Sequence, residues 1–205
     1  MDKKLFLFDC DGVLVDSLQV FEGTVRECLD VIGQPILKSR EDFLDLFDDN
    51  FYSAIVRKGV DLDAFMRAAG PILARVNYTE MNPVGGLLPV IAAMNRRHCL
   101  AIISSGGEKT IRNQLTHFGF DGCFRTILGS DFLLSKIDKI NHAVSAFQVD
   151  KDQAYYVGDT AGDIREAKTA GIRTVAVTWG WHTRERLTAS QPDYLFDKPE
   201  DLLGI

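Results

Sequence analysis

Residues 5–17 read LFLFDCDGVLVDS, so that four apolar residues run directly into two aspartates. An uninterrupted apolar run of this length is typical of a parallel strand that is buried on both faces. We therefore predict a strand at residues 5–8, with Asp9 as the first residue after it. Gly12 permits the chain to turn sharply beneath the carboxylates of Asp9 and Asp11. The stretch predicts a buried strand whose carboxyl end carries a pair of acids.

Four further apolar runs have the same form, and each ends in a polar or glycine-bearing turn. They lie at residues 100–103, 126–128, 154–157 and 174–177. Helical patterns separate these runs, for example at residues 108–118, 136–147 and 161–170. Strands that alternate with helices predict an α/β fold with a doubly wound, Rossmann-like parallel sheet. Ligands of such sheets bind beyond the carboxyl ends of the strands, and this rule selects Asp9, Ser104 and Asp159.

The segment between the first and second strands breaks this alternation. It carries helical patterns at residues 18–32, 40–58 and 62–76, and Pro35, Gly59 and Asn82-Pro83 punctuate them. An all-helical insertion of this size indicates a separate cap domain. We expect the cap at residues 17–82 and the α/β core domain at residues 1–16 and 83–205.

The composition excludes several classes of partner. The 205 residues are 46% hydrophobic and 25% charged, as in ordinary globular proteins, and the formal net charge is -6. Because no basic block stands out, neither nucleic acid nor a membrane is expected as a partner. The strand follows too soon after the N-terminus for a signal peptide, and no apolar run approaches the ~18 residues of a spanning helix. We expect a cytoplasmic protein that is a monomer or a homodimer.

The two acids of the first stretch favour phosphoryl chemistry. Carboxylates two residues apart point the same way if the backbone stays extended. One of Asp9 and Asp11 can then attack phosphorus while the other handles the proton of the leaving group. Two negative charges facing a phosphate need a divalent cation between them, and hard oxygen ligands indicate Mg²⁺. A strand that simply enters a polar turn gives a similar sequence, so this stretch alone does not decide.

A second pair of acids follows the strand at residues 154–157, in the sequence GDTAGD at residues 158–163. Asp159 stands at the strand end, and Asp163 falls one helical turn later on the same face. Asp159 is predicted to bind the metal directly, and Asp163 to bind the metal or a water on it. Favourable placement of acids in a first helical turn explains one of these residues better than the pair.

Two further features provide for an anion. Ser104, Ser105 and Gly106 follow the second strand, where a hydroxyl and glycine-freed backbone N–H groups can cradle phosphate oxygens at a helix N-terminus. Lys136 begins a helical pattern near the same edge of the sheet and can neutralise the nucleophile and the phosphoryl group. Either feature alone is also ordinary for a loop or for a helix surface.

In their order and setting, the four motifs resemble those of the haloacid dehalogenase superfamily, and the resemblance spans the whole chain. It implies a magnesium-dependent phosphatase in which Asp9 is the nucleophile and a metal ligand. It implies that Asp11 is the general acid and base and binds the metal through its backbone carbonyl. Ser104 and Lys136 would hold the phosphoryl group, with Lys139 as the alternative because the proline that often follows the motif lysine is absent.

The same resemblance assigns Asp159 and Asp163 to the magnesium site. Residues 177–194 resemble the phosphoglycolate phosphatase branch, and the expected function is hydrolysis of a small phosphorylated metabolite through an aspartyl-phosphate. A phosphosugar mutase and a non-catalytic binding domain of the same fold remain as alternatives. We expect Trp179 and Trp181 to pack the sheet edge against the last helix, and we assign no role to the histidines. Four cap cations would suit a carboxylate on the substrate, with Phe51 and Tyr52 near them: Arg57, Lys58, Arg67 and Arg75.

Overall fold

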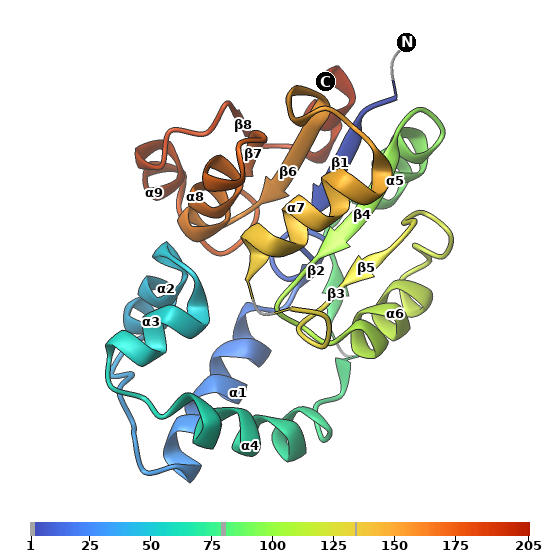
Figure 1. Ribbon diagram of the computed structural model, residues 1–205. Helices are drawn as coiled ribbons and strands as arrows, with labels where there is room; N and C mark the ends of the chain where they lie inside the picture. The colour runs from blue at the N-terminus through green and yellow to red at the C-terminus, as the bar shows by residue number, and fades with distance from the viewer. Residues whose placement is uncertain (1–2, 79–80, 134) are drawn as a thin grey trace.

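The computed structural model describes residues 3–78, 81–133 and 135–205, and a parallel sheet forms its centre (Figure 1). The six strands lie in the order β5-β4-β1-β6-β7-β8. Their bounds are β1 Leu5–Phe8, β4 Cys99–Ile103, β5 Ile127–Leu128, β6 Ala154–Gly158, β7 Arg173–Val177 and β8 Tyr194–Phe196. The five predicted strands are confirmed, as is the α/β fold class. The edge strand β8 was not predicted, because its three half-buried residues lack the long apolar run of the others.

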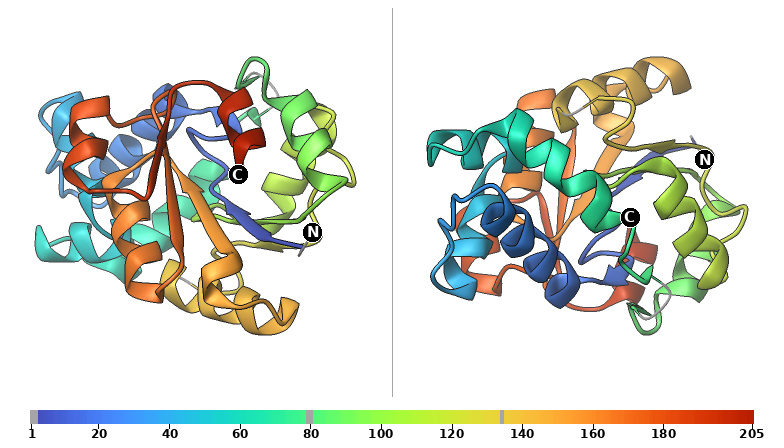
Figure 2. Two further views of the ribbon diagram at one scale, coloured as in Figure 1. Left: turned by 90° about the horizontal axis from the view of Figure 1, so that it is seen from above. Right: turned by 90° about the horizontal axis from the view of Figure 1, so that it is seen from below.

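Helices cover both faces of the sheet, as Figure 2 shows from its two ends. Phe6 and Phe8 point to the face covered by α5 (Leu87–Asn95) and α6 (Glu108–His117). Leu5 and Leu7 point to the opposite face, covered by α7 (Lys136–Phe147) and α8 (Ala161–Ala170). The alternation follows from the period of two along a strand, and burial on both faces explains the continuous apolar runs. The remaining core helices are α9 Arg184–Ala189 and the 3₁₀ helices η3 Lys151–Gln153 and η4 Pro199–Gly204.

The insertion leaves and rejoins the core through a short antiparallel pair. Strands β2 (Val15–Asp16) and β3 (Asn82–Pro83) pair with Asp16 opposite Asn82. The helices between them are α1 Leu18–Val31, α2 Arg40–Leu44, η1 Asp45–Asp48, α3 Phe51–Arg57 and α4 Leu62–Leu73. The helical pattern predicted over residues 40–58 is wrong as one continuous helix. Asn50 accepts from the N–H of Ser53 and caps a new helix, and the 3₁₀ turn η1 precedes it.

The insertion packs around its own apolar cluster, which includes Phe43, Leu46, Ile55 and Phe65. In Figure 1 it lies at the end of the sheet to which the strand arrows point. The division into a core of residues 1–16 and 83–205 and a cap of residues 17–82 stays a prediction. Within the described ranges, no helix is both long and apolar enough to cross a membrane.

The order of the strands fixes where a ligand site is expected. From β1 the chain continues to β4 and β5 on one side of the sheet, and it then returns to β6 on the other side of β1. The strand order therefore reverses between β1 and β6, and ligands of open α/β sheets bind at such a point. Asp9 follows β1 and Asp159 follows β6, so the two acids emerge from neighbouring strands.

Candidate active site

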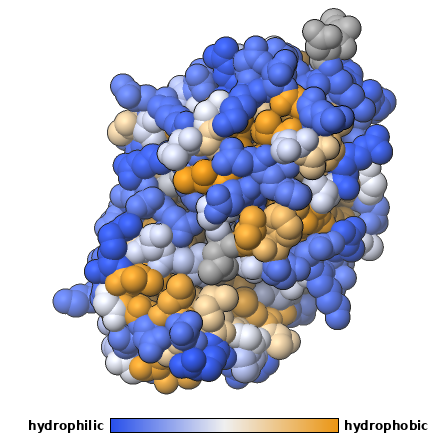
Figure 3. Space-filling model, viewed as in Figure 1, coloured by the Kyte–Doolittle hydropathy of each residue, from blue (hydrophilic) through white to orange (hydrophobic). Residues whose placement is uncertain are grey.

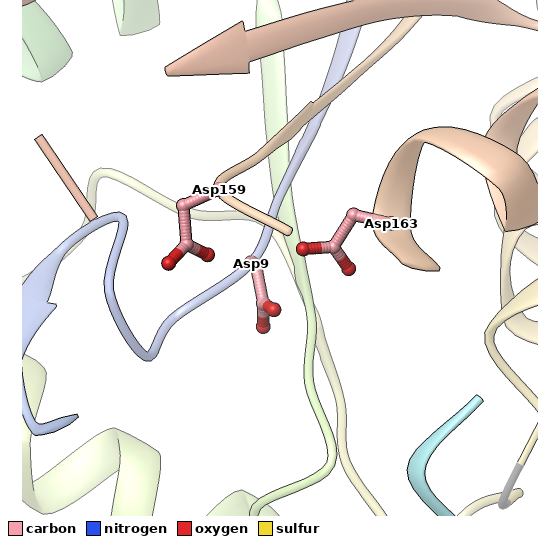
Figure 4. A group of neighbouring side chains, drawn as sticks. All are labelled: Asp9, Asp159 and Asp163. Atoms are coloured by element: carbon pink, nitrogen blue, oxygen red, sulfur yellow. The ribbon is translucent and has the colours of Figure 1, made fainter. Parts of the chain in front are cut away.

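Three buried carboxylates meet at the carboxyl ends of β1 and β6. One oxygen of each of Asp9, Asp159 and Asp163 lies within 4.8 Å of the others. Figure 4 shows the three side chains gathered at one place, Asp9 from the segment after β1, and Asp159 and Asp163 from the loop after β6 and the start of α8. Asp159 is fully buried, and Asp9 and Asp163 are nearly so. The structure thus brings together the acids of the first and fourth sequence motifs.

Local hydrogen bonds hold each of these acids in place. The N–H of Asp9 donates to the Val157 carbonyl at 2.9 Å, which keeps Asp9 in register with β6. Thr160 and Asp163 form a capping box at the start of α8, in which Thr160 Oγ1 accepts from the Asp163 N–H and Asp163 Oδ2 accepts from the Thr160 N–H, each at 3.2 Å. The Thr160 hydroxyl also donates to Asp163 Oδ2 at 2.8 Å. The other oxygen, Asp163 Oδ1, faces the cluster. Asp163 therefore caps the helix with Oδ2 and contributes Oδ1 to the acid cluster.

Lys136 supplies the positive charge of the cluster. Its ammonium donates to Asp9 Oδ2 at 2.7 Å and to Asp163 Oδ1 at 2.6 Å. Lys139, one turn later on α7, is fully buried and donates instead to the Ser104 carbonyl at 2.6 Å. Of the two candidate lysines, Lys136 is the one placed on the acids, and Lys139 supports the loop after β4.

Burial and mutual repulsion raise the pKa values of Asp9 and Asp159. Removal from water raises the pKa of Asp159 well above its usual range, and the charges of Asp163 and Asp9 add to this. Burial likewise raises the pKa of Asp9, although Lys136 opposes the shift. For Lys136 itself burial acts against the charged form, but the carboxylates of Asp163 and Asp9 hold its pKa well above the usual range.

The donor set fits a hard divalent cation. Asp159 Oδ1 is buried and has no hydrogen-bond partner among the described residues, while Asp159 Oδ2 accepts from the Trp181 N–H at 2.7 Å. A buried carboxylate oxygen without a partner is costly, and a metal ion would satisfy it. Mg²⁺ takes oxygen ligands of this kind, and it would relieve the repulsion among the three carboxylates. The arrangement is a candidate site for Mg²⁺.

Asp11 lies beside this cluster but outside it. Its carboxylate is not one of the three that converge, although Asp11 lines the same small cavity as Asp9 and Asp159. Burial, and then the charge of Asp9, raises the pKa of Asp11 to about 7. The turn beneath these acids needs Gly12, whose φ is +77° and where a Cβ atom would lie 2.0 Å from Asp159 Oδ2. Metal binding through the Asp11 carbonyl stays a prediction.

The predicted phosphate cradle has one buried and one accessible serine. Ser104 is fully buried, and its hydroxyl accepts from the Gly106 N–H at 3.0 Å. Ser105 lines the cavity over the acids, and its carbonyl accepts from the Tyr52 hydroxyl at 3.4 Å. The serines and Gly106 thus lie in one loop beside the acids, and their role toward phosphate stays a prediction.

Sequence reasoning missed two residues that join the core to the insertion. Trp181 packs into the apolar cluster of the insertion, with its ring 4.8 Å from that of Phe47, so the expected packing against the last helix is wrong for this residue. His182 Nδ1 accepts from the Ala161 N–H at 3.0 Å, which leaves Nε2 to donate to the Leu44 carbonyl at 3.0 Å. Only their position directly after Gly180, close to a strand end, marked them in the sequence.

The four cations of the insertion that were expected to meet substrate lie elsewhere. Arg57 pairs with Asp49 at 2.9 Å, and Arg75 pairs with Glu27 at 2.6 Å, both at exposed positions. None of the four lines either of the two cavities that open on the acids. Phe51 and Tyr52, the apolar and aromatic candidates, do line these cavities.

Comparisons with known proteins show which family and which proteins the chain resembles. Residues 6–177 match the family described as haloacid dehalogenase-like hydrolase. The chain is 29% identical over 205 residues to a phosphoglycolate phosphatase of Synechococcus elongatus, covering 96% of this chain and 94% of that protein. It is 29% identical over 215 residues to pyrophosphatase PpaX of Listeria innocua, covering 97% and 94%. A predicted phosphatase from Clostridium acetobutylicum has the same fold, with a TM-score of 0.85 at 18% identity over 100% of both chains.

Proposed function

The chain belongs to the haloacid dehalogenase-like hydrolase family, and we propose that it is a magnesium-dependent phosphomonoester hydrolase that works through an aspartyl-phosphate. The observation that carries the proposal is the convergence of Asp9, Asp159 and Asp163, together with the Lys136 ammonium that binds Asp9 and Asp163. Relatives that are named phosphoglycolate phosphatase and pyrophosphatase support a small phosphorylated substrate.

Asp9 serves as the nucleophile. One of its carboxylate oxygens attacks phosphorus in line with the ester oxygen, the P–O bond to the leaving group breaks, and an aspartyl-phosphate forms. Asp11 in its protonated form gives its proton to the departing alkoxide. The raised pKa of Asp11, about 7, keeps part of it protonated near neutral pH, as this role requires.

Water completes the cycle. Asp11, now a carboxylate, takes a proton from a water molecule whose oxygen attacks the phosphorus of the aspartyl-phosphate. The bond between phosphorus and the Asp9 oxygen breaks, so that Asp9 is restored and inorganic phosphate leaves. The same residue thus acts as acid and then as base, and no further proton carrier is needed.

Positive charge stabilises the transferring group. Its charge is spread over the equatorial oxygens, and Lys136 stands next to the nucleophile where this charge develops. Asp9, Asp159 and Asp163 would hold Mg²⁺, which would supply further neutralisation of the negative charge on the transferring group. We assign Ser104, Ser105 and Gly106 to binding of the remaining phosphate oxygens.

The helical insertion at residues 17–82 serves as a cap over this site. Phe21, Phe47 and Phe51 of the insertion line the cavity that holds the acids, so their movement would open or close it. A cap of this kind excludes water from the first step and admits substrate when it opens.

We place the protein in the cytoplasm, because its four cysteines are unpaired, as is usual in a reducing compartment.

Release of inorganic phosphate tests the proposal. Purified protein is assayed with phosphoglycolate, alkyl and aryl phosphates, sugar phosphates and nucleotides, with Mg²⁺ and with a chelator instead. We expect release only with the metal, and at least a ~10³-fold loss of turnover in Asp9→Asn, because this change removes the nucleophile. Near-wild-type turnover of Asp9→Asn would refute the assignment. A phosphosugar product in place of free phosphate would identify a mutase.

A further inference from the structure

A second and larger cavity opens directly beside the acids, between the insertion and the loop after β4. Its volume is about 370 Å³, compared with about 40 Å³ for the cavity over the acids. Pockets of this size accommodate small organic ligands, which occupy roughly 300–1,000 Å³ in known sites. The larger cavity has room for the part of a substrate that extends away from the phosphoryl group.

The two cavities adjoin each other. Asp11, Phe21, Phe47, Phe51 and Ser105 line both of them, so a group bound in the larger cavity lies next to the cavity that holds Asp9. Asp11, the proposed proton donor to the leaving group, stands at the junction. The larger cavity is therefore placed where the leaving group of a phosphomonoester has to lie.

The walls of this leaving-group cavity are largely apolar. Helix α4 contributes Phe65, Met66 and Leu73, and α1 contributes Phe21 and Val25. Figure 3 shows apolar side chains gathered over the lower part of that view, where the insertion lies. The walls favour a ligand that gains from removal of apolar surface from water.

No cation lines the leaving-group cavity among the described residues, and Asp11 is the one charged residue of its described lining. A carboxylate bound there would lose its hydration and meet no positive partner. Several polar side chains of the lining already donate within the protein. Thr24 donates to the Val20 carbonyl, Tyr52 to the Ser105 carbonyl and Gln114 to the Met81 sulfur. The donor hydrogens that these three side chains use here are therefore not free for a leaving group.

We propose that the leaving-group cavity selects an uncharged and mainly apolar group, so that the preferred substrates are phosphomonoesters of apolar alcohols. This inference rests on the proposed hydrolase function and names its substrate class. It disfavours a carboxylate-bearing ester such as phosphoglycolate, in spite of the similarity to proteins of that name.

A series of esters tests the hydrolase function and the preference for an apolar leaving group separately. Phosphate release with Mg²⁺ is measured for ethyl, butyl and hexyl phosphate and for phosphoglycolate, which has two carbons like the ethyl ester but carries a carboxylate. We expect kcat/KM to rise from ethyl to hexyl by up to about 4-fold for each methylene, the ratio that corresponds to its burial. We expect phosphoglycolate to be no better than ethyl phosphate. A flat series, or a preference of 10-fold or more for phosphoglycolate over ethyl phosphate, overturns the inference while phosphate release upholds the hydrolase. No release from any ester overturns both.

A pair of variants tests whether this cavity is the one responsible. Met66 lines it and is 39% exposed, so Met66→Lys places a cation in the wall without opening the core. Val56, on α3, is 47% exposed and lines neither cavity, so Val56→Lys makes a comparable change of charge elsewhere on the insertion. We expect Met66→Lys to raise the ratio of kcat/KM for phosphoglycolate to that for hexyl phosphate at least 10-fold, and Val56→Lys to leave it unchanged. Equal ratios in the two variants would overturn the assignment of the cavity.

Discussion

The ammonium of Lys136 lies 2.7 Å from Asp9 Oδ2, although 127 positions separate the two residues in the chain. Both side chains are about nine-tenths buried, and Asp163 accepts a second bond from the same ammonium. The positive charge of Lys136, held this close to the proposed nucleophile, reduces the electrostatic repulsion between the Asp9 carboxylate and an incoming phosphate. Since Lys136 begins α7 and Asp9 directly follows β1, the parallel sheet and its covering helix bring them together.

Replacement of Lys136 by methionine is expected to lower kcat by about 10²–10³-fold, the range found when one donor to a developing negative charge is removed. The matched control is Lys139→Met, which removes a buried lysine from the same helix but leaves the bond to Asp9 in place. That variant leaves the Ser104 carbonyl without its donor, so it is expected to lose about 1–3 kcal/mol of stability. Kinetics and denaturant unfolding of both variants check this. A larger loss of kcat in Lys139→Met would exchange the roles of the two lysines.

The position of the acids at one edge of the sheet could be predicted from the sequence, because the carboxyl ends of parallel strands lie at the same edge. Asp9 and Asp159 each follow a continuous apolar run, and such runs are the strongest local signal of a buried strand. Lys136 and Lys139 could not be separated in this way. Both stand at the start of one helix, and only packing against the sheet decides which ammonium reaches Asp9.

The residues that line the leaving-group cavity could not be predicted from local sequence patterns for a similar reason. Arg57 and Arg75 were plausible substrate contacts because they lie in the insertion, but each faces an acid on the surface. Which face of a helix meets the site depends on how the insertion docks on the core. Trp181 and His182 contribute to that docking through contacts with Phe47 and Leu44, which are distant in sequence.

Asp11→Asn is expected to separate the two half-reactions. Loss of the general acid and base should lower kcat for an alkyl phosphate by at least about 10²-fold. An aryl phosphate with a good leaving group needs little protonation, so its first step should persist while hydrolysis of the aspartyl-phosphate slows. The expected signature is a burst of about one nitrophenol per enzyme from nitrophenyl phosphate, followed by slow turnover. Equal losses for both esters without a burst would contradict the role given to Asp11.

Gly180 lies against the second acid of the cluster, where a Cβ atom would come within 2.3 Å of Asp159 Cβ and Oδ2. Gly180→Ala is therefore expected to displace the Asp159 carboxylate and to weaken Mg²⁺ activation by about 10–100-fold, the range for loss of support around a metal ligand. Gly85→Ala is the matched control, because a Cβ atom there meets no atom within 4 Å. Titration of phosphate release with Mg²⁺ gives the activation constant of each variant for the metal. If Gly180→Ala has the same activation constant as the wild type, Asp159 is not a ligand of the metal.

The metal-free protein is expected to become less stable as the pH rises from about 4 to about 7. The folded-state pKa of Asp11 is about 7, against an ordinary value of 3.8, with burial as the main cause. The folded state therefore binds more protons than the unfolded state in this window, and its stability falls with increasing pH. The pKa values of Asp9 and Asp159 are raised as well and act in the same direction.

Thermal unfolding with a chelator and with Mg²⁺, at pH values from 5 to 8, measures this effect. The melting temperature without metal should fall across the range, and Mg²⁺ should remove most of the fall because it binds the deprotonated carboxylates. Asp11→Asn, which cannot ionise, should melt higher than the wild type at pH 8 without metal. A wild-type melting temperature that rises with pH in the absence of metal would contradict the assigned shifts.

Arg186 of α9 ties the core to the insertion through three acids. Its guanidinium lies 2.9 Å from Glu41 and 2.7 Å from each of Asp45 and Asp48, and its side chain is 18% exposed. Arg186→Met is expected to ease local opening of α2 and η1 by about 1–2 kcal/mol, which corresponds to a rise of roughly 5–30-fold in their amide exchange.

Arg184→Met is the matched control for Arg186→Met, because Arg184 lies on the same helix but pairs with Asp197 within the core. Hydrogen exchange of residues 40–57 should accelerate in Arg186→Met and stay at the wild-type rate in Arg184→Met. Because Phe21, Phe47 and Phe51 of the insertion line the cavity over the acids, the same opening should raise KM for a phosphomonoester more than it lowers kcat. If exchange accelerates equally in both variants, α9 is merely destabilised and Arg186 does not hold the insertion against the core.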